Sequence, residues 1–158
     1  MEGMEKVSIN PFEKFAKDWA LVTAGTKEKF NSMTIAWGGM GTLWRVPVLQ
    51  IFIRPNRYTF KFLEENEYFT VSFYDKKYKK ALGIMGTKSG KDFDKVQLTG
   101  LTPKFLENGI TYEEATETYV CKKIYMKEMD KSKFPEKVSD MYKDEPAHYV
   151  IFGELVNL

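Results

Sequence analysis

Residues 19–39, WALVTAGTKEKFNSMTIAWGG, are the stretch of sequence that decides the fold class. The apolar run 19–24 favours a buried strand, and residues 25–29 are polar enough to form a turn. From Asn31 to Trp37 the sequence alternates, which places Met33, Ile35 and Trp37 on one face of a second strand. Two short strands around a polar turn predict a β-hairpin.

The rest of the chain continues this pattern of short strands. We predict further strands at 48–53, 68–74, 116–129 and 148–156, short helices at 58–66 and 76–85, a flexible glycine-rich connection at 38–41, and an exposed, charged excursion at 130–147. Many strands without a βαβ rhythm favour a mainly β fold, a closed or partly closed β-barrel with short helices, over a doubly wound sheet.

Length and composition set further limits on the class of protein. A chain of 158 residues is a normal size for one domain, and we expect a single domain over residues 1–158. The net charge of +2 gives no reason to expect a nucleic-acid partner. No apolar run approaches the roughly 20 residues that span a membrane, and the N-terminal stretch lacks the apolar core of a signal peptide. We therefore expect a cytoplasmic protein without a membrane partner.

Several motifs for nucleotide binding, metal binding and catalysis are incomplete in this sequence. Gly39 and Gly41 suggest a dinucleotide fingerprint, but Trp44 stands where the third glycine belongs. Residues 86–91 resemble a phosphate-binding P-loop, but the spacing is one residue short. One cysteine and one histidine exclude a disulfide and a Cys/His zinc cage. Cys121 is more typical of a buried, inert thiol, although a pair with His148 stays possible.

One set of segments does suggest a binding site. The only three arginines lie between positions 45 and 57, and the arginine fork suits phosphate or carboxylate groups. Segments 31–39, 54–59 and 88–92 together offer positive charge for a phosphate, amides and carbonyls for a polar ring edge, and a tryptophan wall. The alternatives are that Trp37 belongs to the core and that the lysines form a solvated surface.

Five segments carry a resemblance to a known family: 18–25 (DWALVTAG), 30–39 (FNSMTIAWGG), 53–59 (IRPNRYT), 89–95 (SGKDFDK) and 148–154 (HYVIFGE). In this order and at these intervals, the chain resembles the flavin reductase-like, FMN-binding split-barrel family, including its flavoredoxin-type members. The resemblance extends over nearly the whole chain. It implies a six-stranded Greek-key split barrel that forms a homodimer and binds FMN near the dimer interface.

The resemblance also implies which residues bind FMN. Segment 31–34 would meet the isoalloxazine ring beside Trp37, and Arg54, Arg57 and Thr59 would lie by the phosphate with the loop 89–95. The full predicted set is Asn31, Ser32, Met33, Thr34, Ala36, Trp37, Arg54, Arg57, Tyr58, Thr59, Ser89, Gly90, Lys91 and Lys95. The family often carries a histidine before the last strand in a Gly-Asp-His setting, which here is Pro-Ala-His148, so a catalytic role for His148 stays open.

Two functions follow from the resemblance as hypotheses. The first is an oxidoreductase that transfers electrons from NAD(P)H through FMN to a flavin or another acceptor. The flavin would do the chemistry, so no catalytic side chain is required and no metal is expected. The second is an FMN electron carrier that exchanges electrons with protein partners and has no nicotinamide-dependent activity of its own. The sequence does not separate the two.

Overall fold

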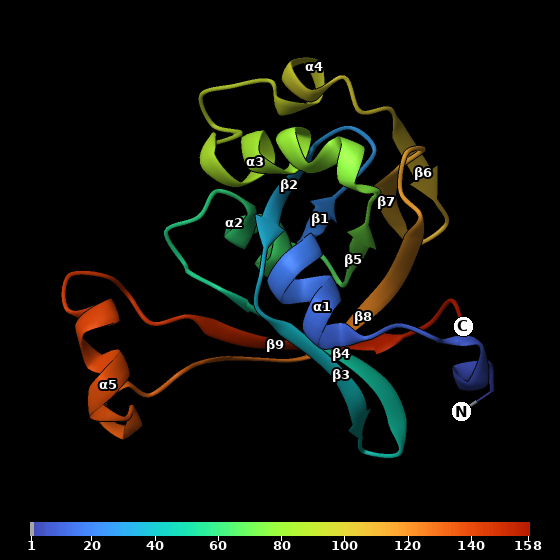
Figure 1. Cartoon of the computed structure of the whole chain (residues 1–158). Helices are drawn as coiled ribbons and strands as arrows, with labels where there is room; N and C mark the ends of the chain where they lie inside the picture. Colours follow the sequence, from blue (N-terminus) through green and yellow to red (C-terminus); the bar gives the residue numbers. More distant parts are fainter. Residues whose placement is uncertain (1) are drawn as a thin grey trace.

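A bent antiparallel sheet forms the centre of the computed structural model, which describes residues 2–158 (Figure 1). The strands are β1 (Ala20–Gly25), β2 (Phe30–Ile35), β3 (Gly38–Leu43), β4 (Val46–Ile53), β5 (Tyr68–Phe73), β6 (Pro103–Leu106), β7 (Gly109–Tyr112), β8 (Glu117–Glu128) and β9 (Tyr149–Leu155). The helices are α1 (Pro11–Glu13), α2 (Thr59–Glu65), α3 (Lys79–Thr87), α4 (Lys95–Thr99) and α5 (Glu136–Ser139).

The order of the strands confirms the predicted mainly β class but leaves the sheet open. Seven strands follow the order β2-β1-β5-β8-β9-β4-β3, and β6 and β7 form a separate hairpin. Since β2 and β3 are the two outer strands, the sheet is not a closed barrel. The main sheet has seven strands, whereas the family resemblance implied a six-stranded Greek-key barrel. The predicted hairpin of residues 19–37 is present as β1 and β2, paired from Ala20–Ile35 to Gly25–Phe30.

The seventh strand is β3, which replaces the flexible connection expected at 38–41. Its backbone pairs with β4 along its whole length, and the two-residue turn Trp44-Arg45 joins them with positive φ angles of 52° and 65°. Such a turn matches the twist of a hairpin even without glycine. Gly38 is required by packing, because a Cβ there would lie 2.6 Å from the Phe15 ring. Gly38 therefore allows the close approach of β3 to Phe15.

Strand β8 produces the bend that divides the sheet into two halves. Its first half pairs with β5 and its second half with β9, and the register shifts between Lys123 and Tyr125. An irregularity of this kind bends a strand and increases its twist. In Figure 1 the half that contains β4 and β9 accordingly crosses the half that contains β1 and β5.

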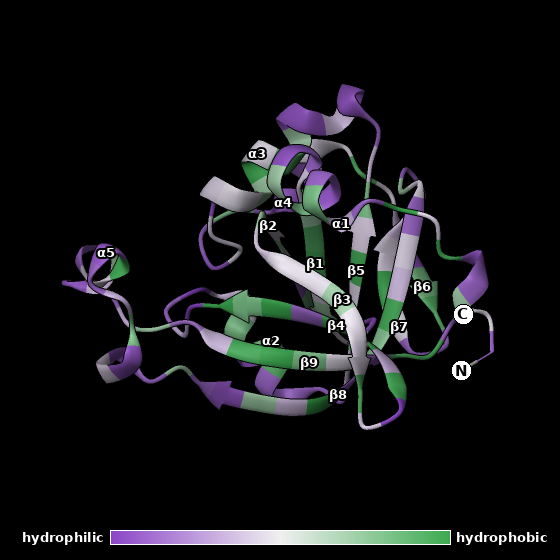
Figure 2. Ribbon diagram, turned by 60° about the horizontal axis from the view of Figure 1, so that its bottom comes forward, coloured by the Kyte–Doolittle hydropathy of each residue, from purple (hydrophilic) through white to green (hydrophobic). Residues whose placement is uncertain are grey.

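Two apolar layers lie on opposite sides of β1, and β5 contributes to the inner one. On the inner side, Val22, Val71 and Phe73 belong to the main core between the two halves of the sheet. On the outer side, Leu21 packs with Leu82 beneath α3. In β5, Thr70 and Ser72 on the other side of the strand are buried as well, and Figure 2 shows hydrophobic residues in these strands. Strand β1 is hydrogen-bonded to β5 along one edge and to β2 along the other, so this buried strand positions β2.

The segment 130–147 projects from the body as an arm with α5 at its end (Figure 1). Most of its residues are exposed and hydrophilic, as the sequence predicted (Figure 2). The arm returns to the sheet through Ala147, which is buried, and so delivers His148 to the start of β9. Among residues 2–158, no helix has the length and apolar character needed to span a membrane.

Candidate functional site

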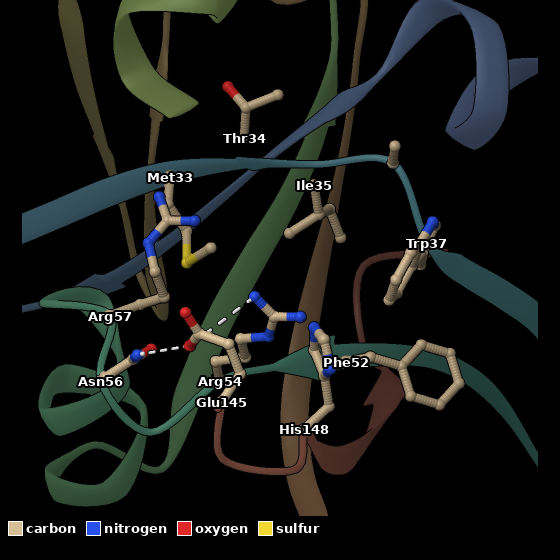
Figure 3. A pocket seen from close by; sticks show the side chains of 11 residues that line it. Met33, Thr34, Ile35, Trp37, Phe52, Arg54, Asn56, Arg57, Glu145 and His148 are labelled. Carbon is tan, nitrogen blue, oxygen red and sulfur yellow. Dashed lines mark hydrogen bonds and ion pairs between the residues drawn. The ribbon is translucent and has the colours of Figure 1, made fainter. Parts of the chain in front are cut away.

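The larger of two adjoining cavities lies where β2 and β4 end beside the root of the arm (Figure 3). Its volume is about 520 Å³, within the range of about 300–1,000 Å³ typical of ligand pockets. It is lined by Met33, Thr34, Ile35, Ala36, Trp37, Phe52, Arg54, Asn56, Arg57, Glu145 and His148. Trp37 presents an exposed aromatic face here, since 47% of its surface is accessible. The cavity thus combines aromatic walls with two arginines.

The smaller cavity, of about 130 Å³, adjoins the larger one, because Met33, Asn56 and Arg57 line both. Its remaining lining residues are Asn31, Tyr58, Thr59, Gly86, Thr87, Lys88, Ser89, Gly90 and Lys95. The described residues around it include three cations and several hydroxyl groups, and none of them is a carboxylate. This composition suits a small anion such as phosphate.

Arg57 is positioned by the turn that precedes α2. Its backbone amide donates to the Arg54 carbonyl at 3.1 Å, and its Nη2 donates to the carbonyl of Gly86 at 3.0 Å. Burial and the neighbouring Arg54 lower the pKa of Arg57, but a guanidinium stays charged at any ordinary pH. Arg57 therefore places a fixed positive charge at the junction of the two cavities.

Lys95 is a buried cation that the sequence did not distinguish from its neighbours. It is the first residue of α4, and only 5% of its surface is accessible. Its Nζ donates to the carbonyls of Ser32 and Met85, which leaves the third proton of the ammonium group for another acceptor. Burial, followed by the charge of Arg57, lowers the pKa of Lys95 to about 8. The ammonium has no carboxylate partner among the ion pairs of residues 2–158.

The loop before α4 packs closely on β2. Asn31 Nδ2 donates to Thr59 Oγ1 at 2.7 Å, which fixes the amide of Asn31 against the start of α2. A Cβ on Gly90 would lie 2.0 Å from Asn31 Oδ1, so only glycine fits this close approach. The Gly90 backbone consequently holds Ser89 at the edge of the smaller cavity.

The far wall of the larger cavity is a polar cluster at the root of the arm. Glu145 Oε2 lies 3.9 Å from Arg54 Nη1 and accepts a hydrogen bond from Asn56 Nδ2 at 3.2 Å (Figure 3). The ring of His148 lies 5.1 Å from that of Trp37, and His148 Nδ1 shares a hydrogen bond of 2.9 Å with the Tyr142 hydroxyl. Burial and Arg54 lower the pKa of His148 to about 4, so its imidazole is neutral at pH 7.

The structure brings most of the predicted residues to these two cavities. Those at the larger cavity are Met33, Thr34, Ala36, Trp37, Arg54 and Arg57, and those at the smaller one are Asn31, Met33, Arg57, Tyr58, Thr59, Ser89, Gly90 and Lys95. Trp37 lies beyond the end of β2 and is half-exposed, so it is not on the buried face with Met33 and Ile35. Of the two cavities, Arg54 lines only the larger one, whereas Lys88, Lys95 and Ser89 line only the smaller one.

Three predicted residues, Ser32, Thr34 and Lys91, do not direct their side chains into either cavity. Side chains alternate along a strand, so Ser32 points away from the side of Asn31 and Met33. Its hydroxyl bonds Thr23 Oγ1 at 2.7 Å and the Tyr112 hydroxyl at 2.8 Å instead. Lys91 lies exposed at the surface of its loop, outside the lining of both cavities. Thr34 lines the larger cavity, but its side chain points away toward α3 (Figure 3), where it donates to the Leu82 carbonyl.

Seven residues that line the two cavities are absent from the set predicted from the sequence: Ile35, Phe52, Asn56, Gly86, Thr87, Lys88 and Glu145. Asn56 had a usable signal, since it stands between the two arginines of the turn. Glu145 had none, because it lies in a charged excursion that carries no periodicity. Only the path of the arm back to β9 places it in the cavity.

Other candidate chemistries find no support in the described part of the chain. Residues 2–158 contain no group of three or more His, Cys, Asp or Glu side chains placed to hold a metal ion. Cys121 is fully buried in β8, and burial raises the pKa of its thiol. A buried, protonated thiol is a poor nucleophile, which agrees with the inert role predicted for Cys121.

Comparison with known proteins identifies the family. Residues 12–130 match the family described as flavin reductase like domain. Because this match covers well over half of the sequence, the chain belongs to the flavin reductase-like family. Among curated proteins, none matches the sequence.

Solved structures of other proteins share the fold of this chain. A flavoredoxin from Methanosarcina acetivorans superposes with a TM-score of 0.70 at 23% identity, over 88% of this chain and 66% of its own. An FMN-binding protein from Thermus thermophilus gives 0.70 at 20% identity, over 95% and 76%. An NADH:FAD oxidoreductase from Streptomyces globisporus C-1027, in complex with NAD and FAD fragments, gives 0.66 at 17%, over 89% and 72%. This chain therefore spans about two thirds of the flavoredoxin.

Proposed function

We propose that this protein is an FMN-dependent oxidoreductase that transfers electrons from NAD(P)H to a flavin or another acceptor. The observation that carries the proposal is the junction of an anion-binding cavity with a larger, aromatic-walled cavity at Arg57. Such a pair suits one ligand that joins a phosphate to a flat ring system. Membership of the flavin reductase-like family and the FMN-binding protein among the similar structures support the choice of FMN.

The donor groups of the two cavities fit FMN in type and in arrangement. Arg57, Lys95 and the Ser89 hydroxyl would hold the phosphate, because charge-assisted hydrogen bonds to an anion are the strong ones. Met33, Ala36 and Trp37 would contact the ring in the larger cavity. Bound FMN supplies the redox chemistry, and the protein supplies binding and orientation.

The side chains of the larger cavity have restricted roles under this proposal. His148 is neutral at pH 7 and is held through Nδ1 by Tyr142, so it shapes the wall beside Trp37 without adding charge. Trp37, half-exposed at the cavity mouth, would limit which second ligand reaches the ring. The sequence has no separate dinucleotide fingerprint, so a nicotinamide donor would dock in this same cavity.

Anaerobic reduction tests the proposal. FMN-loaded protein is mixed with NADH or NADPH, and bleaching of the flavin absorbance is followed over time. We expect one or both donors to bleach the flavin at a rate far above that of free FMN. If FMN binds but neither donor reduces it, the oxidoreductase proposal is wrong, and the FMN electron carrier is the better interpretation.

The lowered pKa of Lys95 predicts a pH dependence of FMN binding. The protonated form of Lys95 binds the phosphate, and in the free protein it is lost as the pH rises through about 8. Affinity should therefore fall about 30-fold between pH 7 and pH 9.5, because binding then requires uptake of a proton. Titration calorimetry at several pH values measures this. A Lys95→Met variant serves as control, since its affinity should be flat over the same range.

We also propose that the protein is a homodimer with the ring site covered at the interface. An apolar cavity of about 530 Å³ shares Ala36, Trp37 and Phe52 with the larger cavity, and Phe12 at its edge is 84% exposed. Twofold dimers are the commonest oligomers, and a second copy would bury this surface. Light scattering should give about twice the chain mass of 18.4 kDa. A mass of one chain with FMN still bound would contradict the proposal.

A further inference from the structure

Arg54 occupies a place that the binding of FMN phosphate does not explain. It is absent from the lining of the smaller cavity and faces the larger one, where its partner is a carboxylate of the protein itself, Glu145 (Figure 3). We propose that Arg54 recognises the carboxylate of a planar substrate in the larger cavity, and that Glu145 is an internal occupant which this substrate displaces. The proposal rests on the proposed function, since the substrate would exchange electrons with the bound flavin.

The contact between Arg54 and Glu145 is incomplete. One oxygen of Glu145 lies 3.9 Å from Nη1, at the outer limit of an ion pair, and the side chain of Glu145 is 45% exposed. The Nε of Arg54 is buried and has no hydrogen-bond partner within residues 2–158. An arginine fork is best satisfied by two parallel bonds to one carboxylate. A ligand carboxylate that engages Nε together with a second nitrogen would supply the missing partner.

Glu145 can leave without disturbing the core. Exposed ion pairs of this kind contribute little to stability. The arm is held near Glu145 by polar contacts, in which Lys131 Nζ donates to the carbonyls of Tyr142 and Glu145 at 3.1 Å and 2.6 Å. These contacts hold the backbone and leave the side chain of Glu145 free to rotate. The buried anchor of this segment is Ala147, two residues further along the chain.

Arg54 itself stays in place when Glu145 leaves. Its guanidinium lies 5.5 Å from the ring centre of Tyr142, a cation–π contact that does not involve Glu145. Tyr142 is in turn fixed by its hydrogen bond to His148. The guanidinium of Arg54 therefore continues to face the cavity, where it can bind another anion.

The rest of the cavity defines the chemical class of the substrate. The carboxylate of Glu145, which also accepts from Asn56, marks a position where this cavity accommodates such a group. Trp37 and Phe52 provide flat aromatic walls on the same cavity (Figure 3). Because His148 is neutral, Arg54 provides the charge on this side. An aromatic or other planar carboxylate satisfies all three features.

Benzoate and its neutral isostere benzamide are the probes for this proposal. Each is titrated into FMN-loaded protein, with the flavin absorbance shift and the NMR signal of the Trp37 indole as readouts. We expect benzoate to bind about tenfold more tightly than benzamide. Glu145→Gln should strengthen benzoate binding about fivefold and leave benzamide unchanged, since only the charged competitor is removed. The matched control is Asp144→Asn, an exposed neighbour that should change neither.

Arg54→Gln should remove the preference for benzoate, and Arg54→Lys should retain part of it, because a lysine keeps the charge but not the fork. Equal binding of the two probes in wild type and in Glu145→Gln, or no binding of either, would overturn the proposal. The same titration on FMN-free protein, read through Trp37, separates the two proposals. A carboxylate preference there would persist even if FMN binding or reduction failed.

Discussion

Replacing Lys95 by methionine is expected to weaken FMN binding by about 10- to 100-fold, while the affinity for riboflavin, which lacks the phosphate, changes little. The reason is the position of Lys95, a buried ammonium that lines the smaller cavity and has no carboxylate partner in the described chain. A buried cation of this kind costs free energy unless something neutralises it. The phosphate of FMN would be that counter-charge.

The controls separate binding from folding. Methionine leaves the carbonyls of Ser32 and Met85 without their donor, so the melting temperature of Lys95→Met must be recorded beside its affinity. Lys91→Met removes the same charge at an exposed position of the loop that precedes α4, and this variant should bind FMN like wild type. Equal loss of FMN affinity in both variants would mean that only the general charge of the loop matters, against our assignment.

Replacing Gly90 by alanine should be nearly as damaging to FMN binding, with a loss of about tenfold or more. The added Cβ would stand 2.0 Å from Asn31 Oδ1, and Asn31 is held by its hydrogen bond to Thr59. The loop must then move away from β2, and it would carry Ser89 out of the smaller cavity. The free energy of unfolding should fall by only about 1 kcal/mol, because an exposed loop can shift where a core could not.

Gly83→Ala is the matched control for this variant. Gly83 lies within α3, and apart from its chain neighbours and the backbone of its own helix, no atom of residues 2–158 lies within 4 Å of the position of its Cβ. Alanine there should leave FMN binding unchanged and stabilise the helix by up to about 1 kcal/mol. If Gly90→Ala bound FMN as tightly as Gly83→Ala does, the loop would not form part of the phosphate site.

The strands that alternate or run apolar could be predicted from the sequence, since burial imposes their pattern. The observed ends of six strands lie within two residues of the ends predicted from the sequence. These strands are β1, β2, β4, β5, β8 and β9. The strand missed within 38–43 could not be predicted from side chains, because its glycines pair through the backbone alone. The short β6–β7 hairpin likewise has few core side chains to mark it.

The residues of the candidate site that are close together in the sequence could be predicted. The residues that only the fold brings together could not. The arginine turn and segment 31–37 stood out by residue type, and both line the cavities. The side chains of Ser32 and Lys91 do not lie in the cavities as predicted. Ser32 points to the other face of its strand, and Lys91 is exposed on its loop. Glu145 is brought to Arg54 across 91 positions of chain by the arm, a contact that no local pattern encodes.

The central claim is that FMN binds with its phosphate in the cavity formed by Arg57, Lys95 and Ser89. Calorimetric titration of FMN-free protein with FMN and with riboflavin at pH 7 tests it most directly. Two charge-assisted contacts of about 1.5–3 kcal/mol each predict that FMN binds at least about 100-fold more tightly than riboflavin. Equal affinities for the two flavins, or no binding of FMN, would contradict the account.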